Sequence, residues 1–172
     1  MSKIAKRDFI PLDIAVLTIS DTRTEHDDKS GKTLCNRLQS EHHNVYEKVL
    51  VPDDTYKIRA VVSPWIAEPK PDVILTTGGT GVTGRDGTPE AIRPLLDKEI
   101  AGFGEMFRTL SFETIRTSTL QSRTFAGVAN RTYIFCLPGS ASACAEAWDK
   151  LISHQLDYRT RPCNLVELMP RL

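Results

Sequence analysis

The chain has 172 residues, 40% of them hydrophobic, which suits one globular domain with a sizeable core. Lysine plus arginine and aspartate plus glutamate number 22 each, so no net positive charge is available to hold nucleic acid or an acidic membrane. The N-terminus, MSKIAKRDFIP, lacks the apolar run of a secretory signal, and nothing approaches the roughly 18 apolar residues of a membrane span. We therefore expect neither nucleic acid nor a membrane as the partner.

The first half of the chain predicts alternating strands and helices after a loose arm over residues 1–12. The near-continuous apolar run DIAVLTIS is typical of a strand buried on both faces. Leu34 and Leu38 then lie one helical turn apart on one face. The predicted elements are strands over 13–20, 45–51 and 72–76, and helices over 30–42 and 54–67, of which Pro64 should shorten or kink the second.

In the second half, Thr88 is predicted to cap a helix that has Pro89 at its first position and that Pro94 should disturb. A second helix is predicted from apolar residues that repeat at i, i+3, i+4 and i+7: Phe103, Met106, Phe107 and Leu110. This stripe suits either the core or a subunit contact. The remaining predictions are a hairpin of strands over 126–130 and 132–137, a helix over 141–156 and an irregular tail.

Strands that alternate with helices favour parallel pairing, with helices on both faces of the sheet. We therefore predict an α/β fold: a three-layer sandwich with a mostly parallel central sheet. No repeat or linker divides the sequence, so residues 1–172 are expected to form a single domain.

The pattern of cysteines disfavours a disulfide framework and a structural zinc site. Cys35, Cys136, Cys144 and Cys163 include no CxxC pair, and the four histidines are not at zinc-ligand spacing. Reduced thiols in the cytoplasm are the expectation that follows.

Half of the ten glycines fall within residues 78–87, here called the glycine loop, directly after the predicted strand 72–76. Glycine permits positive φ and close approach of a ligand to the backbone, and a loop entering a helix N-terminus presents N–H groups to anions. Ligands of open α/β sheets also gather beyond the carboxyl ends of strands. The loop lacks the Gly-Lys-Ser/Thr ending of a P-loop, and its formal GxGxxG order is weak evidence for a dinucleotide. A phosphate-bearing ligand is the favoured interpretation.

The stretch TTGGTGVTGRDGTPEA resembles the signature of the molybdenum cofactor biosynthesis family that includes MogA, MoaB and the gephyrin G domain. The match combines TGGTG, then Arg85-Asp86, then Thr88-Pro89-Glu90. Further similarity covers most of the chain, at Ser20-Asp21, Pro52-Asp53, Gly102 to Glu105, Leu120 to Arg123 and Leu137 to Gly139. FGEMFRTLSFE, TSTLQSR and RTRPCN most resemble the MoaB branch.

The resemblance implies a MogA/MoaB-like fold and a role in molybdenum cofactor biosynthesis through molybdopterin binding. Adenylyltransferases of this family convert molybdopterin and ATP to adenylyl-molybdopterin and pyrophosphate, with Mg²⁺ as the metal. The resemblance assigns Asp53 and Asp86 as the catalytic and magnesium-binding pair. Asp53 also suits an N-cap, although Asp54 is available for that role, and Asp86 also suits a turn.

Further residues are expected to bind substrate and phosphate. The glycine loop supplies Gly78, Gly79, Thr80 and Gly81, and the resemblance adds Ser122 and Arg123. Gly139 and Ser140 open the last predicted helix and could bind an anion at its N-terminus. A hydroxyl and a guanidinium suit phosphate contacts, although Ser122 and Arg123 also suit an ordinary surface pair. Many adenylyltransferases of the family have another polar residue where Ser140 stands. A molybdopterin-binding or scaffolding protein with weak or no transferase activity is therefore the alternative. Homotrimers or homohexamers are implied.

Overall fold

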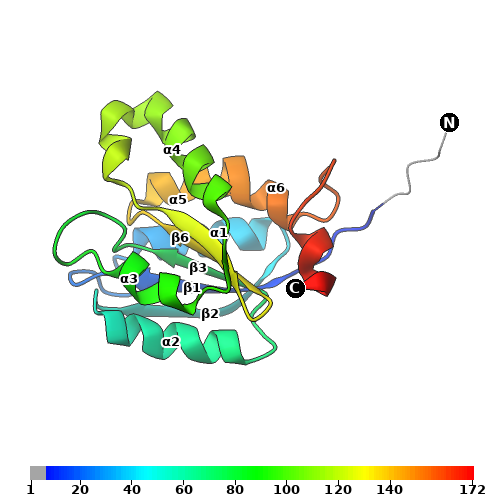
Figure 1. Ribbon diagram of the computed structural model, residues 1–172, viewed down its shortest axis with the longest axis horizontal. Helices are drawn as coiled ribbons and strands as arrows, with labels where there is room; N and C mark the ends of the chain where they lie inside the picture. Colours follow the sequence, from blue (N-terminus) through cyan, green and yellow to red (C-terminus); the bar gives the residue numbers. More distant parts are fainter. Residues whose placement is uncertain (1–6) are drawn as a thin grey trace.

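The computed structural model describes residues 7–172 and centres on one six-stranded sheet (Figure 1). Its strand order is β2-β1-β3-β6-β5-β4. Four strands are parallel: β1 (Asp13–Ile19), β2 (Asn44–Val51), β3 (Val73–Thr77) and β6 (Thr132–Leu137). Two strands pair antiparallel, β5 (Phe125–Ala129) with β6 and β4 (Lys98–Glu99) with β5. The prediction of a mostly parallel sheet is confirmed.

Helices cover both faces of the sheet. They are α1 (Lys29–Ser40), α2 (Thr55–Ala67), α3 (Thr88–Ile92), α4 (Ala101–Ile115), α5 (Ala141–Ala147) and α6 (Ser153–Leu156). Side chains alternate along β1, so Val16 joins one core with α1, α4 and α5, while Leu17 joins a second core with α2 and α3. The three-layer sandwich follows from this alternation. Among residues 7–172, no helix is long and apolar enough to cross a membrane.

Several boundaries differ from the prediction. Helix α2 continues through Pro64 to Ala67, because the proline lies in its last turn and removes only one N–H there. Thr88 is not the cap of α3: Gly87 holds that position without a side-chain cap, and the Thr88 hydroxyl donates to the Gly78 carbonyl over 2.8 Å. Strand β4, with two residues, was not predicted.

Residues 7–12 of the predicted loose arm over 1–12 are docked on the domain. Residues 1–6 of that arm lie outside the described part of the chain. The Arg7 guanidinium donates to both carboxylate oxygens of Glu167, Phe9 packs on His43, and Leu12 belongs to the core. The end of the chain also departs from an irregular tail, since residues Val166–Arg171 form 3-10 turns.

Candidate functional site

The glycine loop leaves β3 at the carboxyl end of the parallel strands and enters α3. Gly78 (φ 110°) and Gly79 (φ 63°) have backbones that favour glycine. A Cβ on Gly78 would lie 2.0 Å from the Ile19 carbonyl oxygen, at the end of β1. A Cβ on Gly79 would lie 2.3 Å from the Thr88 hydroxyl and 2.5 Å from an oxygen of Asp53. These two glycines therefore let the loop pass directly between the ends of neighbouring strands.

Asp53 faces this loop from the end of β2. Its Oδ1 accepts a hydrogen bond of 3.0 Å from the Gly87 N–H. Asp54, not Asp53, caps α2, because its carboxylate accepts from the N–H groups of Tyr56 and Lys57. Burial raises the pKa of Asp53, and the nearby carboxylates of Asp21 and Asp86 add to that rise. The Asp53 carboxylate thus points at the loop. Its charged form is disfavoured by burial and by the neighbouring carboxylates, and a bound cation would stabilise that form.

Asp86 faces the loop from within. Its Oδ2 accepts from the Thr83 N–H over 2.8 Å and from the Thr83 hydroxyl over 2.6 Å. The same oxygen lies 2.7 Å from the position of a Cβ on Gly81. Burial acts to raise the pKa of Asp86, but the hydrogen bonds from Thr83 and Gly81 and the charge of Arg123 lower it overall. Asp86 is therefore a turn-forming carboxylate that stays ionised at neutral pH.

The structure brings Asp53 and Asp86 to one loop. Among residues 7–172, no group of three or more His, Cys, Asp or Glu side chains is arranged to hold a metal. Magnesium at phosphate-transfer sites is commonly held by only one or two carboxylates, with substrate phosphates and water completing its shell. A pair of carboxylates therefore fits a magnesium ion that arrives with a nucleotide.

Arg123 supports the glycine loop from the strand β5 side. Its Nε donates to the Gly81 carbonyl and its Nη2 to the Asp86 carbonyl, both over 2.6 Å. Its Nη1 contacts Glu90, and its backbone N–H donates to the Thr80 carbonyl over 2.8 Å. The guanidinium that the resemblance assigns to substrate phosphate is therefore engaged by the loop itself.

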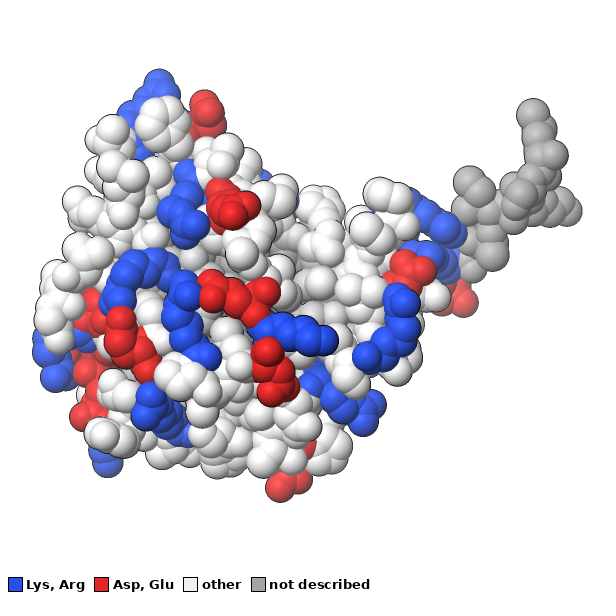
Figure 2. Space-filling model, in the orientation of Figure 1, with Lys and Arg blue, Asp and Glu red and all other residues white. Residues whose placement is uncertain are grey.

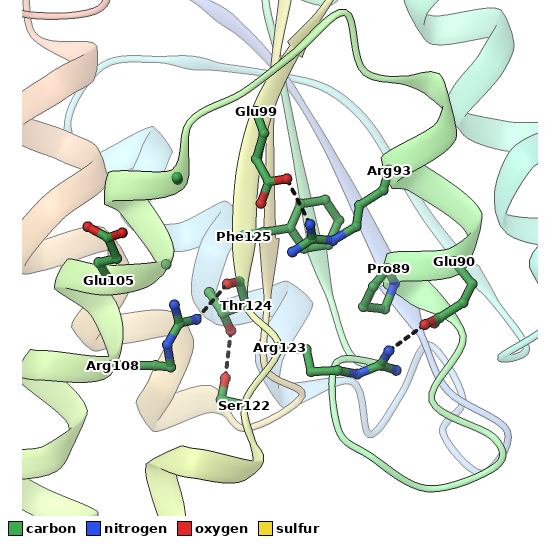
Figure 3. A pocket seen from close by; sticks show the side chains of 12 residues that line it. Pro89, Glu90, Arg93, Glu99, Glu105, Arg108, Ser122, Arg123, Thr124 and Phe125 are labelled. Atoms are coloured by element: carbon green, nitrogen blue, oxygen red, sulfur yellow. Dashed lines mark hydrogen bonds and ion pairs between the residues drawn. The ribbon is translucent and has the colours of Figure 1, made fainter.

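A pocket of about 430 Å³ opens beside the loop, between α3 and α4 (Figure 3). The Arg93 guanidinium lies 4.6 Å from the centre of the Phe125 ring and pairs with Glu99 over 2.7 Å. Arg108 donates to the Thr124 carbonyl across the pocket over 3.1 Å. This combination of a stacked guanidinium, an aromatic ring and polar walls suits a flat, polar heterocycle.

Ser122 lines the same pocket, next to Arg123 in the sequence. Its hydroxyl lies 2.8 Å from that of Thr124. Figure 3 marks this hydrogen bond with a dashed line among the side chains that line the pocket. Ser122 and Arg123 therefore both line the pocket, and the Arg123 guanidinium also contacts the glycine loop.

Gly139 and Ser140 follow β6 at the same edge of the sheet. A Cβ on Gly139 would lie 3.5 Å from Gly78, and the Gly139 carbonyl accepts from Arg23 over 2.7 Å. The Ser140 hydroxyl caps α5 by accepting from the Ala143 N–H over 3.1 Å. These two residues thus join the rim of the site, with the serine already used as a helix cap.

Charge on this face is mixed. Figure 2 shows lysine and arginine side chains interleaved with aspartate and glutamate side chains over the middle of the face. Ion pairs bridge the rim, Arg85 with Asp21 and Arg123 with Glu90 among them. The face therefore offers local, directional charges and no extended field of one sign.

Known proteins are similar in sequence to this chain over nearly its whole length. A family model described as "Probable molybdopterin binding domain" matches residues 15–158. Molybdenum cofactor biosynthesis protein B of Escherichia coli (strain K12) is 55% identical over 164 residues, which cover 95% of this chain and 96% of that protein. The chain belongs to the MoaB family of molybdenum cofactor biosynthesis proteins.

Solved MoaB structures share the fold. The crystal structure of a molybdenum cofactor biosynthesis protein B superposes with a TM-score of 0.84 at 42% identity, covering 87% of this chain and 94% of that one. The MoaB of Thermus thermophilus, described as a molybdopterin biosynthesis enzyme, superposes with a TM-score of 0.73 at 36% identity, covering 80% of this chain and 87% of that one. The predicted MogA/MoaB-like fold, the family and the molybdopterin-binding domain are confirmed.

Three residues of this MoaB family member, Asp21, Arg85 and Arg93, contribute to the site although the sequence analysis assigned them no separate role. Asp21 follows β1 and pairs with Arg85 through both of its oxygens. Arg93 enters the pocket from the turn after α3. Both Asp21 and Arg85 stand in the segments that resemble the family, and that was the available signal. Their partners lie too far along the chain for spacing to reveal them.

Proposed function

We propose that this MoaB family member catalyses the Mg-ATP-dependent adenylylation of molybdopterin. One observation carries the proposal: two carboxylates, Asp53 and Asp86, contact a single glycine loop at the carboxyl ends of the parallel strands. A site for two phosphate-bearing substrates needs an open backbone for the phosphates and carboxylates for the accompanying cation.

In this reaction a phosphate oxygen of molybdopterin forms a bond to the α-phosphorus of ATP, and the bond from that phosphorus to pyrophosphate breaks. The attacking phosphate is mostly ionised near neutral pH, because its second pKa is about 6, so no strong protein base is required. The protein's task is to align two anions and offset their repulsion. Asp53 and Asp86 would hold magnesium, which neutralises phosphate charge when bound.

The chain's own residues divide the remaining work. Half-buried Gly79 and Gly81 would present backbone N–H groups to phosphate, while Gly78 fixes the turn before them and Thr80 is buried between them. Arg123 holds this loop in shape through its two carbonyl contacts. Gly139 and Ser140 complete the rim on the β6 side.

We assign the pterin end of molybdopterin to the pocket beside Ser122. The pocket volume of about 430 Å³ lies within the range of small-ligand sites. Ser122 lines this pocket next to Arg123, which contacts the loop, and its hydroxyl would donate to the molybdopterin phosphate. The pterin and the nucleotide would thus approach the carboxylate pair from different sides.

Incubation of the protein with molybdopterin, ATP and magnesium tests the proposal directly. Adenylyl-molybdopterin and pyrophosphate should form in equal amounts, and omission of magnesium should stop both. Molybdopterin binding measured by calorimetry, without product under any magnesium concentration, would replace the proposed activity by the alternative.

The alternative is a molybdopterin-binding or scaffolding protein with weak or no transferase activity. It is favoured because the side chains expected to bind magnesium or phosphate already form hydrogen bonds within the protein. Asp86 is occupied by Thr83, Arg123 by the loop carbonyls, and Ser140 by the cap of α5. A site whose side chains already have hydrogen-bond partners can bind molybdopterin while those side chains stay in place and do not contact the reacting phosphates.

We further propose a homotrimer or homohexamer that works in the cytoplasm. Large apolar side chains are exposed on α4 and the turns after it: Met106, Phe112, Ile115 and Leu120. Exposed apolar clusters of this kind mark protein contacts. The cytoplasmic location is supported by four cysteines that are all free thiols.

A further inference from the structure

Asp21 connects the two segments that carry the carboxylate pair. Its Oδ1 accepts from the Asp53 N–H over 3.0 Å and from Nη2 of Arg85 over 2.8 Å. Its Oδ2 accepts from Nε of Arg85 over 2.8 Å. The Asp21 carboxylate therefore contacts the backbone of Asp53 and the side chain of Arg85. Arg85 directly precedes Asp86 in the sequence.

The sheet order explains why this position can do so. Strand β1 lies between β2 and β3, and Asp21 follows β1. Asp53 follows β2, and Arg85 lies in the loop that follows β3. A side chain at the end of the middle strand reaches both neighbours, whereas Asp53 and Asp86 come from strands that do not pair with each other.

We infer that Asp21 and Arg85 form a positioning pair that sets Asp53 and Asp86 relative to each other for the transfer step; this rests on the proposed function. Both oxygens of Asp21 are engaged by donors of the protein, so the pair acts through its neighbours. Displacing a reacting group by about 1 Å can lower a rate by about 100-fold. Loss of a contact that positions Asp53 and Asp86 can therefore lower kcat.

Overall stability depends little on the same pair. The Arg85 side chain is 66% exposed and that of Asp21 is 36% exposed. Ion pairs this accessible to solvent contribute little to unfolding, because water screens them and the side chains lose freedom on pairing. Removal of the pair should therefore change the melting temperature by less than about 4 °C.

The test compares Asp21→Ala, Asp21→Asn, Arg85→Ala and the double alanine variant with the wild type. The control is Asp149→Ala, because Asp149 accepts from Nε and Nη2 of Arg37 over 2.8 and 3.0 Å in the same manner, away from the site. The measurements are kcat, the magnesium concentration for half-maximal rate, the melting temperature, and amide hydrogen exchange over residues 79–87.

Asp21→Ala should lower kcat by about 10- to 100-fold and raise the magnesium requirement, with faster exchange in the loop. Asp21→Asn should lose less, since its carbonyl still accepts from Asp53. The double variant should be no worse than Asp21→Ala, because the two residues act as one unit. Asp149→Ala should match the wild type throughout.

Unchanged kcat and magnesium requirement in Asp21→Ala would overturn the inference, as would an equal loss in Asp149→Ala. A wild type without turnover would instead remove the proposed function. Loop exchange then decides the inference: faster exchange in Asp21→Ala supports the pair as the organiser of this site, and unchanged exchange overturns it.

Discussion

The carboxylate of Asp53 accepts a hydrogen bond of 3.0 Å from the backbone N–H of Gly87, 34 residues further along the chain. The bond joins the end of β2 to the last residue of the glycine loop. The other Asp53 oxygen fills the space that a side chain on Gly79 would occupy. The loop and the carboxylate therefore form one unit, so a change to either should affect the other.

Asp86→Asn should lower turnover by at least about 100-fold while leaving molybdopterin affinity nearly unchanged. The amide oxygen can still accept from Thr83, so the turn should survive, but the charge that would hold magnesium is lost. Steady-state kinetics and calorimetry on the same preparation separate the two effects. Normal turnover would reduce Asp86 to a turn residue and leave the metal to Asp53.

Gly79→Val should abolish nucleotide and molybdopterin binding. Valine is strained at the positive φ of position 79, and its Cβ would lie too close to the side chains of Thr88 and Asp53. Gly84→Val is the matched control, because no neighbour lies within 4 Å of a Cβ there. Calorimetry should show binding lost in the first variant and kept in the second, with both variants folded. Equal affinities in the two would mean that the loop does not line the site.

Light scattering at micromolar concentration should give a mass at least three times 19.2 kDa. Figure 1 shows the far end of α4 and the turns after it standing away from the sheet, where Ile115 and Leu120 are exposed. Leu120→Glu should reduce the mass by placing a charge in the contact. Tyr56→Glu, at an exposed site on α2, should not. A monomeric wild type would exclude the trimer and the hexamer.

Acid should destabilise the protein through His43. Burial lowers the pKa of this histidine from 6.5 to about 4, with His42 adding to the shift and Asp157 opposing it. The unfolded chain then takes up a proton that the folded state resists, so stability falls as pH drops from about 6.5 to about 4. The full effect is at most about 3 kcal/mol.

Denaturant melts of the wild type and of His43→Gln between about pH 7 and pH 4 measure this contribution. The variant should show a shallower loss of stability toward acid, because it has no imidazole to protonate. His154→Gln, at an exposed histidine, should keep the wild-type slope. Parallel slopes for the wild type and His43→Gln would show that other groups cause the acid sensitivity.

The parallel strands and the glycine loop could be predicted because each is a local property of the sequence. Buried apolar runs mark β1 and β3, and clustered glycines mark the loop. Strand β4 has too few residues for any periodicity to be visible. The cap of α3 was misassigned because Thr88 hydrogen-bonds to Gly78, a partner ten residues earlier that helix-start patterns do not include.

That Asp53 and Asp86 lie near the glycine loop could be predicted from the sequence, but the partners of the candidate site residues could not. Asp53 and Asp86 both lie against this loop, and Ser122 lines a pocket, while their roles stay a prediction. The role of Arg123 was not visible, because its acceptors are backbone carbonyls, which look the same at every position of a sequence. The contacts of Asp21 depend on the strand order, which sequence periodicity does not determine.

Three arginines tie the rim of the site together across long stretches of chain. Their contacts span 37 residues from Arg123 to Asp86, 64 from Arg85 to Asp21 and 116 from Arg23 to Gly139. Contacts so distant in sequence form only when the whole sheet has assembled. A ligand held by these loops therefore binds the complete native state and draws the entire folding equilibrium toward it. Molybdopterin should accordingly protect the slowest-exchanging amides of the core strands as well as those of the loop.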